Sequence, residues 1–280
     1  MSALFSRINL ADSATLSENT TGSMLRALTE LQKSWARGLA RGPANGTGSV
    51  PAELTLRADL GSSKLVNIVS LLGLNDAVAT GTIALSASAF GSTDAGSGTI
   101  GNTGSNGQTH GNALTWRGSA TCRYIEIYIQ VFALPAGLRH VDMRRLWIGQ
   151  GTTEPTHYLE LSSGVNADWS VETVDLSTAS TTPRGGIYAS AQGSYRVWRL
   201  NVTGMTAAEA SNLRQWIALT RGKQEIVAVL RDYDQGTEYE ALSDNTIYGR
   251  LAEWGPVQHT GGDTYACEGI TIQEVPYPAL

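Results

Sequence analysis

Four carboxylates crowd one short stretch of the chain, and paired carboxylates can do chemistry. Asp232, Asp234, Glu238 and Glu240 lie within Arg-Asp-Tyr-Asp-Gln-Gly-Thr-Glu-Tyr-Glu, residues 231–240. Two such groups can hydrolyse a glycosidic bond, and several can bind Ca²⁺. The spacing suits neither use, since it lacks the carboxylates at positions 1, 3, 5 and 12 of an EF-hand loop. A solvated acidic turn is favoured over a glycan-degrading enzyme that uses Asp232 or Glu238.

Other catalytic and metal-binding patterns are missing from the sequence. The histidines are far from one another and from any cysteine, which argues against zinc; they are His110, His140, His157 and His259. Cys122 and Cys267 lie in alternating runs, so we expect two buried free thiols. No Gly-x-Ser-x-Gly elbow is present. We therefore expect no metal, no cofactor and no enzymatic activity.

Residues 91–111 form the most polar stretch of the chain. They contain seven glycines and many Ser, Thr and Asn residues. So little apolar surface cannot offset the entropy lost on ordering, which predicts a long exposed loop. No Gly-Lys-Ser/Thr follows, so the loop is not a phosphate cradle. Its candidate contacts with a ligand or partner are Asp94, Asn102, Asn106 and His110.

Five tryptophans could stack on a sugar, although most lie in runs typical of a core. They are Trp147, Trp169, Trp198, Trp216 and Trp254. We predict core packing for them rather than ligand binding.

The elements around the loop have the period of β-strands. Residues 59–75 and 141–149 are apolar segments, and the run Leu65–Leu74 suits a strand buried on both faces. Leu54, Leu56 and Ala58 alternate with polar residues, and 82–88 predicts a further strand. In 123–131 the alternation is strict: Ile125, Ile127, Ile129 and Val131 on one face, Tyr124, Glu126, Tyr128 and Gln130 on the other. These patterns predict a β-sandwich.

The second half predicts more strands and one well-marked helix. Thr206 and Glu209 form a capping box, which opens a helix that Gly222 ends. Its apolar face is Ala210, Leu213, Trp216, Ile217 and Thr220. Strands are predicted over 157–162, 169–175, 194–202, 224–231, 246–253 and 263–274, with a linker at 151–155.

A further helix is predicted over residues 22–39. Its apolar stripe is Met24, Leu28, Leu31, Trp35 and Leu39, and Arg26, Glu30, Lys33 and Arg37 lie opposite. The stripe either packs on its own domain, which we favour, or grips a neighbouring molecule.

Composition excludes several classes of function. The 280 residues are 41% hydrophobic and only 16% charged, below the roughly 25% of an average soluble domain. Residues 1–150 hold 12 Lys and Arg against 9 Asp and Glu, and residues 151–280 hold 8 against 16. The halves thus carry net charges of +3 and −8, with no basic cluster for nucleic acid. No secretory signal or membrane-spanning run is visible, so we expect a soluble protein made in a cytoplasm.

The order of motifs in the first half resembles a known family. Asp-Leu-Gly, an apolar strand ending in Asn, a polar loop, an Arg-Tyr-x-x-Ile strand and Arg-Leu-Trp-Ile-Gly occur in that order. This order resembles the galactose-binding-like jelly-roll domain of minor tail and baseplate proteins of siphophages, over about residues 50–150. Domains of this type bind glycans in some settings and act as spacers in others.

The second half, residues 150–280, resembles the tail-tube-like belt domain of phage distal tail proteins. The capped helix and Tyr248-Gly-Arg-Leu-Ala-Glu-Trp254 with its closing strand carry this resemblance. In distal tail proteins the sandwich commonly follows the belt domain, whereas here it comes first, which leaves the exact level in the tail open.

Together the resemblances imply a mainly β protein: an N-terminal jelly-roll β-sandwich and a C-terminal tail-tube-like β-sandwich or barrel with one α-helix. The expected domains are an arm with an amphipathic helix (1–49), the sandwich (50–150) and the belt domain (151–280).

The implied function is structural, in a ring of the distal tail or baseplate that links the tail tube to the tip. The implied partners are a hexameric ring of itself, the tail tube protein, and the baseplate hub and tape-measure proteins. The protein would sit in the virion tail after assembly in the host cytoplasm. The alternative is a carbohydrate-binding adhesion module whose loops contact a glycan of the host envelope. Neither hypothesis involves specific nucleic-acid binding or membrane insertion.

Overall fold

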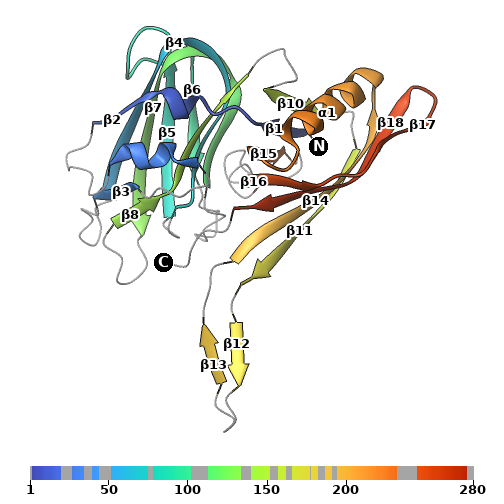
Figure 1. The fold of residues 1–280 in the computed structure, drawn as a ribbon. Helices are drawn as coiled ribbons and strands as arrows, with labels where there is room; N and C mark the ends of the chain where they lie inside the picture. The colour runs from blue at the N-terminus through green and yellow to red at the C-terminus, as the bar shows by residue number, and fades with distance from the viewer. Residues whose placement is uncertain are drawn as a thin grey trace.

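Antiparallel strands dominate the fold, which is mainly β with one α-helix, as the sequence predicted (Figure 1). The structure is a computed structural model. It describes residues 2–19, 27–34, 40–43, 52–74, 78–101, 113–133, 140–151, 157–161, 166–176, 178–181, 187–190, 194–231 and 245–275. Two large sheets organise the chain, one of six strands and one of eight.

Two strands of 21 residues each, β4 (Ala52–Leu72) and β7 (Ala113–Ala133), run through the first sheet. They pair with each other, with register shifts between Asp59 and Lys64 and between Val66 and Ile68. Ahead of both shifts β4 also pairs with β2, and from Val66 onward it pairs with β9. Register shifts bend a strand pair, so each of the two strands contributes one half to each layer of a sandwich.

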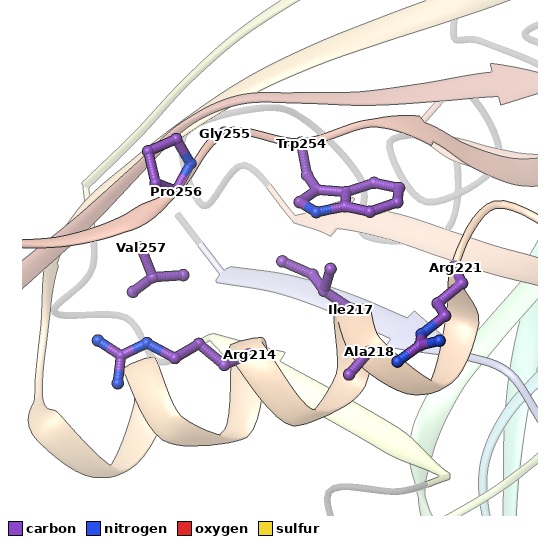
Figure 2. A pocket seen from close by; sticks show the side chains of 8 residues that line it. All are labelled: Arg214, Ile217, Ala218, Arg221, Trp254, Gly255, Pro256 and Val257. Carbon is purple, nitrogen blue, oxygen red and sulfur yellow. The ribbon is translucent and has the colours of Figure 1, made fainter.

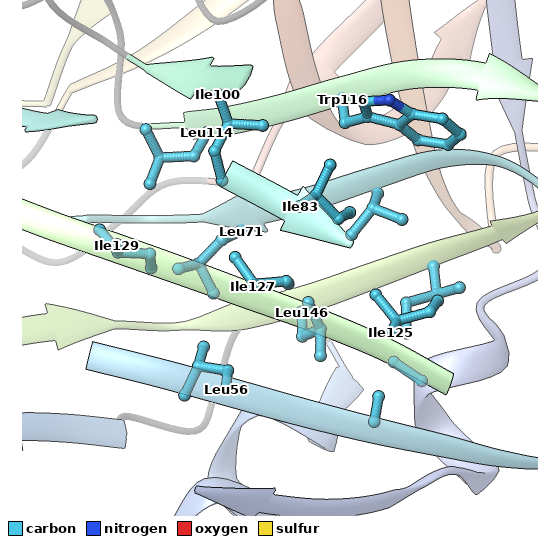
Figure 3. Packing of buried hydrophobic residues seen from close by; sticks show 14 of the residues in the cluster. Leu56, Leu71, Ile83, Ile100, Leu114, Trp116, Ile125, Ile127, Ile129 and Leu146 are labelled. Atoms are coloured by element: carbon cyan, nitrogen blue, oxygen red, sulfur yellow. The ribbon is translucent and has the colours of Figure 1, made fainter. Parts of the chain in front are cut away.

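Shorter strands complete this first domain. They are β2 (Thr15–Glu18), β5 (Val78–Ser86), β6 (Gly96–Gly101) and β9 (Arg145–Gln150), with β3 (Ala40–Pro43) paired to β8 (His140–Met143). Two 3₁₀ helices, η1 (Leu10–Ser13) and η2 (Leu28–Gln32), pack beside them. Figure 3 shows apolar side chains from both halves of β4 and β7 in one core.

The predicted alternation of the first sheet is confirmed. Leu54, Leu56 and Ala58 are buried, as are Ile125, Ile127, Ile129 and Val131. The two apolar segments, 59–75 and 141–149, are also direct neighbours, because β4 and β9 pair from Val66 with Gln150 to Leu72 with Arg145. Val69 and Leu71 face the first core, whereas Ile68 and Leu72 face the second sheet. Burial on both faces from Val66 onward explains why this run is nearly continuously apolar.

One part of the predicted loop is a strand instead. Residues 96–101 form β6, which pairs with β5 at the edge of the sheet, and 102–111 lie outside the described residues. The glycines have a packing reason: a Cβ on Gly98 or Gly118 would lie 2.5 or 2.4 Å from atoms of the Trp116 ring. Backbone pairing and a flat indole therefore order a stretch whose own side chains are too small to do so.

The helix predicted over 22–39 is wrong for the described residues 27–34. The 3₁₀ helix η2 forms there instead, and its C-cap Lys33 is already extended. The Leu31 carbonyl accepts a hydrogen bond from buried Arg145, and Gln32 donates to the carbonyls of Ala11 and Ala14. These tertiary hydrogen bonds take the place of the backbone hydrogen bonds that an α-helix would form. Leu31 still packs on its own domain, in the first core.

The second sheet has the order β10-β1-β15-β16-β18-β14-β11, with β17 paired to β18. Its strands are β1 (Ser2–Ser6), β10 (Tyr158–Leu161), β11 (Asn166–Asp175), β14 (Ser194–Met205), β15 (Glu225–Arg231), β16 (Thr246–Glu253), β17 (Val257–Gly261) and β18 (Thr264–Glu274). A small ribbon of β12 (Thr178–Thr181) and β13 (Ile187–Ser190) continues from β11 and β14. The sequence did not predict β1, which inserts between β10 and β15 although both lie more than 150 residues away.

The one α-helix among the described residues, α1 (Ala207–Thr220), begins and packs as predicted. The Thr206 hydroxyl accepts from the Glu209 amide, and the Glu209 carboxylate accepts from the Thr206 amide. Ala210, Leu213, Trp216, Ile217 and Thr220 are its buried residues, and most of them join the core on one face of the second sheet. No helix in the described part of the chain is long and apolar enough to cross a membrane.

The other face of the second sheet packs against the sandwich. Leu4, Ile68, Leu72, Ala113, Trp147, Val227, Val229 and Tyr248 form this interdomain core. Thr246 Oγ1 donates to Thr115 Oγ1 across it at 2.9 Å, Thr115 also bonds to Ser70 within the sandwich at 2.9 Å, and Trp147 Nε1 donates to Ser6 Oγ. The two large sheets therefore share a buried, hydrogen-bonded interface.

A fully buried arginine completes that interface. The Arg145 guanidinium bonds to Asp12 at 2.6 Å, to Glu225 at 2.9 Å and to the Leu31 carbonyl. Burial raises the pKa of Glu225, and Arg145 opposes that rise. Burial alone would lower the pKa of Arg145, but Asp12 and Glu225 turn the net direction upward. The ion pair with Arg145 therefore offsets part of the effect of burial on Glu225.

We expect Arg145→Leu to lower the free energy of unfolding by about 3–5 kcal/mol, because the buried Glu225 carboxylate loses the guanidinium that balances its charge. Without Arg145 the pKa of Glu225 rises further. Above that raised pKa the folded variant must bury a charged Glu225 carboxylate, so the loss of stability is largest near neutral pH. The loss shrinks as the pH falls through the pKa of Glu225, because the protonated carboxyl carries no charge. Urea unfolding at two pH values measures both effects. The neighbouring Arg144→Leu, outside the buried network, is the control, and an equal loss at both pH values would contradict the argument.

Candidate functional site

Of the four predicted contact residues, the structure describes only Asp94. Asn102, Asn106 and His110 lie outside the described residues, as do the carboxylates of 232–240. Asp94 accepts from the Ala87 amide at 3.1 Å and from Ser88 Oγ at 2.9 Å. Hydrogen bonds from Ser86 and Ser88 hold the pKa of Asp94 below its usual value. Asp94 therefore fixes the turn between β5 and β6.

That turn places Phe90 on the outer surface of the sandwich. The Phe90 ring meets Tyr124 of β7 edge to face, with centroids 4.9 Å apart. The Arg57 guanidinium lies 5.2 Å from the Phe90 centroid, and that of Arg123 lies 4.8 Å from the Tyr124 centroid. Two aromatic rings and two guanidiniums are thus interleaved on one surface.

Two ion pairs fix these guanidiniums. Arg123 binds Asp59 through two parallel bonds of 2.8 and 2.9 Å, and Arg57 Nε lies 2.5 Å from Glu126. The bond from Arg123, followed by that from the Gly61 amide, lowers the pKa of Asp59. We call the set the polar–aromatic face; its residues are Arg57, Asp59, Phe90, Arg123, Tyr124 and Glu126.

The polar–aromatic face suits binding better than catalysis. A general acid at neutral pH needs a raised carboxyl pKa, whereas that of Asp59 is lowered. The face holds planar donors, acceptors and rings in set orientations, because each charged group is anchored by another. The alternation of 123–131 predicted that Tyr124 and Glu126 share a face. Phe90 and Asp59 could not be assigned to it, since their approach depends on the turn and on the register between β4 and β7.

A pocket opens on the far side of the second sheet, between α1 and the connection from β16 to β17 (Figure 2). Trp254, Gly255, Pro256 and Val257 form its upper wall, and α1 contributes Arg214, Ile217, Ala218 and Arg221. Trp254 is 42% exposed, so the core packing predicted for it is wrong, whereas Trp147, Trp198 and Trp216 are buried as predicted.

A hairpin arm projects from the body of the protein (Figure 1). β11 pairs with β14 over ten residues, and β12 and β13 extend the same ribbon. β11 is also the last strand of the second sheet, so its outer edge has no partner strand in the described chain. Val171 and Leu176 are exposed on this arm.

The described residues hold no cluster of His, Cys, Asp or Glu that could bind a metal ion. His259 contacts the Gly262 carbonyl and the Tyr265 ring on an exposed hairpin. Cys122 and Cys267 are buried free thiols, as predicted. Burial, and next the charge of Asp94, raises the pKa of Cys122 to about 11.

No protein-family model matches the chain, and no curated protein matches it. Several solved carbohydrate-binding modules align with about half of it. A chitosan-binding module from a chitosanase/glucanase of Paenibacillus sp. IK-5 is 19% identical, with 50% of this chain and 98% of that one covered and a TM-score of 0.36.

A CBM32 module from a family 31 glycoside hydrolase of Clostridium perfringens is 13% identical, with coverages of 51% and 95% and a TM-score of 0.39. A fucose-binding module of Streptococcus pneumoniae is 11% identical, with coverages of 51% and 94% and a TM-score of 0.34. Sequence identities and TM-scores this low assign no ligand to this chain.

We expect both cysteines to resist thiol reagents in the folded protein. With a pKa near 11 for Cys122, roughly one thiol in a thousand is ionised near pH 8, and the thiolate is the reactive form. Labelling with a chromogenic disulfide should therefore proceed only with unfolding, and both thiols should react at once in strong denaturant. Rapid labelling of the native protein would reveal an accessible nucleophile and reopen a catalytic role.

Proposed function

We propose that this chain is a non-enzymatic binding protein whose N-terminal sandwich binds carbohydrate. The observation that carries the proposal is the polar–aromatic face, in which two ion pairs and two aromatic rings are interleaved on the outer surface. Rings offer flat apolar contact to the C–H face of a sugar. Guanidiniums and carboxylates, already oriented by one another, offer donors and acceptors to its hydroxyls.

Preorganisation favours this surface as a binding site. Asp59 and Arg123 are bound bidentately, and Asp94 fixes the turn that carries Phe90. Little side-chain freedom is therefore lost when a ligand binds, which lowers the cost of association. The partly exposed pairs remain open to solvent on one side, so a ligand reaches them without breaking either pair.

Substitution of the rings tests the proposal. We expect Tyr124→Ala and Phe90→Ala to weaken glycan binding at least about tenfold, since each removes stacking area at the centre of the site. Binding is first located on a glycan array and then measured by calorimetry on the full chain. Arg199→Ala, which removes an exposed pair with Glu172 elsewhere, is the matched control. If no glycan binds the native protein, or if the ring variants bind as well as the control, the proposal fails.

A second candidate function is assembly, which the hairpin arm and the free edge of β11 favour. A two-stranded ribbon is only marginally stable alone in water. An unpaired strand edge with exposed apolar residues also offers hydrogen bonds to another chain. We propose that β11 of one copy lies along a neighbouring copy, head to tail, as in a ring.

The setting proposed for such a ring is a bacteriophage tail, near the baseplate, with tail tube, hub and tape-measure proteins as partners. The domain limits 50–150 and 151–280 remain part of this proposal, and residues 2–6 contribute a strand to the second sheet rather than to an arm.

Oligomeric state tests the assembly proposal. We expect light scattering and native mass spectrometry to show closed oligomers of the full chain. Val171→Lys should reduce the association constant at least about tenfold, because a charge replaces exposed apolar surface at the contact. Ser170→Lys, on the opposite face of β11, is the control. A protein that stays monomeric at high concentration, or one whose assembly ignores Val171→Lys, would rule out this interface.

A further inference from the structure

We propose that the pocket between α1 and residues 254–257 binds a small aromatic carboxylate. This site lies in the second domain and is independent of the polar–aromatic face. Its volume is about 380 Å³, within the range of roughly 300–1,000 Å³ that small-molecule sites occupy.

The body of the pocket is apolar. Ile217 and Ala218 form its floor on α1, and Pro256 and Val257 form one side (Figure 2). Trp254 stands above Ile217 on the opposite side of the space from the helix (Figure 2). A sugar placed here would leave most hydroxyls without protein partners, which is unfavourable for polar groups taken out of water. An apolar ring fits the lining without that cost.

The position of Trp254 is set by the glycine that follows it. The Gly255 amide donates to the Glu268 carbonyl at 3.0 Å, and a Cβ on Gly255 would lie 2.2 Å from that oxygen. Only glycine allows the chain to approach β18 so closely. The connection is therefore pinned to the sheet, and the indole remains 42% exposed above the helix.

Two arginines supply charge at the pocket. Arg214 and Arg221 both line the pocket from α1 and are separated by about two helical turns, with Arg214 beneath Val257 and Arg221 beside Ala218 (Figure 2). Neither forms an ion pair with any residue that the structure describes; Arg214 stacks 5.6 Å from the Tyr265 centroid. Residues 151–280 carry a net charge of −8, and these two guanidiniums place positive charge at the pocket within that acidic half. They select an anion, and guanidiniums bind carboxylates through paired hydrogen bonds.

Arg221 also holds a costly backbone conformation. It is the C-cap of α1 with φ of 40°, the one positive φ found in a non-glycine residue of the described chain. Arginine is disfavoured there relative to glycine. The helix therefore ends in an arginine at a position where glycine would be less strained, and this places a guanidinium at the mouth of the pocket.

Matched small acids test the proposal on the full chain. The probes are indole-3-acetate, its neutral analogue indole-3-acetamide, and glucuronate, which keeps the charge but has a polar ring. Saturation-transfer NMR and calorimetry should show binding of indole-3-acetate, with the amide at least about tenfold weaker and glucuronate weaker than the aromatic acid. Equal binding of acid and amide would overturn the role of the arginines. Tighter binding of glucuronate would overturn the aromatic body.

Variants place the probe in this pocket. Arg214→Gln, Arg221→Gln and Trp254→Ala should each weaken indole-3-acetate at least about tenfold, whereas Arg199→Gln on the same domain should leave it unchanged. Arg221→Gly separates binding from stability: it should lose affinity while the melting temperature stays level or rises, because the positive φ is relieved. Undiminished binding in both arginine variants would overturn the site. Tyr124→Ala should leave this binding intact, so its outcome is separate from that of the glycan proposal.

Discussion

The buried guanidinium of Arg145 is the interaction on which the arrangement of the two domains depends. It sits at the start of β9, where it reaches Asp12 of η1, the carbonyl of Leu31 in η2, and Glu225 at the start of β15. One side chain thereby joins three segments of the first domain to the second sheet. Burying a charge is costly unless every partner is in place, so these segments must assemble together. The apolar interdomain core around Trp147 and Tyr248 then closes beside it.

This constraint gives β4 its central position. Its second half lies between two cores, one inside the sandwich and one against the second sheet. The outer surfaces are consequently left for recognition: the polar–aromatic face on the sandwich, and the α1 pocket with the hairpin arm on the other domain. Each is a surface feature supported by a rigid element, which is how binding residues are commonly held in place.

Local patterns in the sequence predicted much of the fold. The alternation around Ile127, the run Leu65–Leu74 and the capping box at Thr206 each depend on neighbours within a few residues. The alternation and the capping box are confirmed, and the run is buried from Val66 onward, whereas Leu65 is exposed. The helix over 22–39 was wrong across η2 because hydrogen bonds from Gln32 and Arg145 satisfy the backbone there. The strand β6 was missed because its order comes from pairing with β5 and from the ring of Trp116.

The sequence by itself determined that this is a β-rich protein with one capped helix, two buried thiols and a sandwich core, because periodicity and caps are local properties. Only the tertiary structure decided which surface side chains meet. Phe90 approaches Tyr124 because Asp94 fixes a turn, and Trp254 stands over α1 because Gly255 is pinned to β18. Such contacts join residues that are far apart along the chain. Their geometry depends on strand register and backbone approach, which no short window of sequence contains.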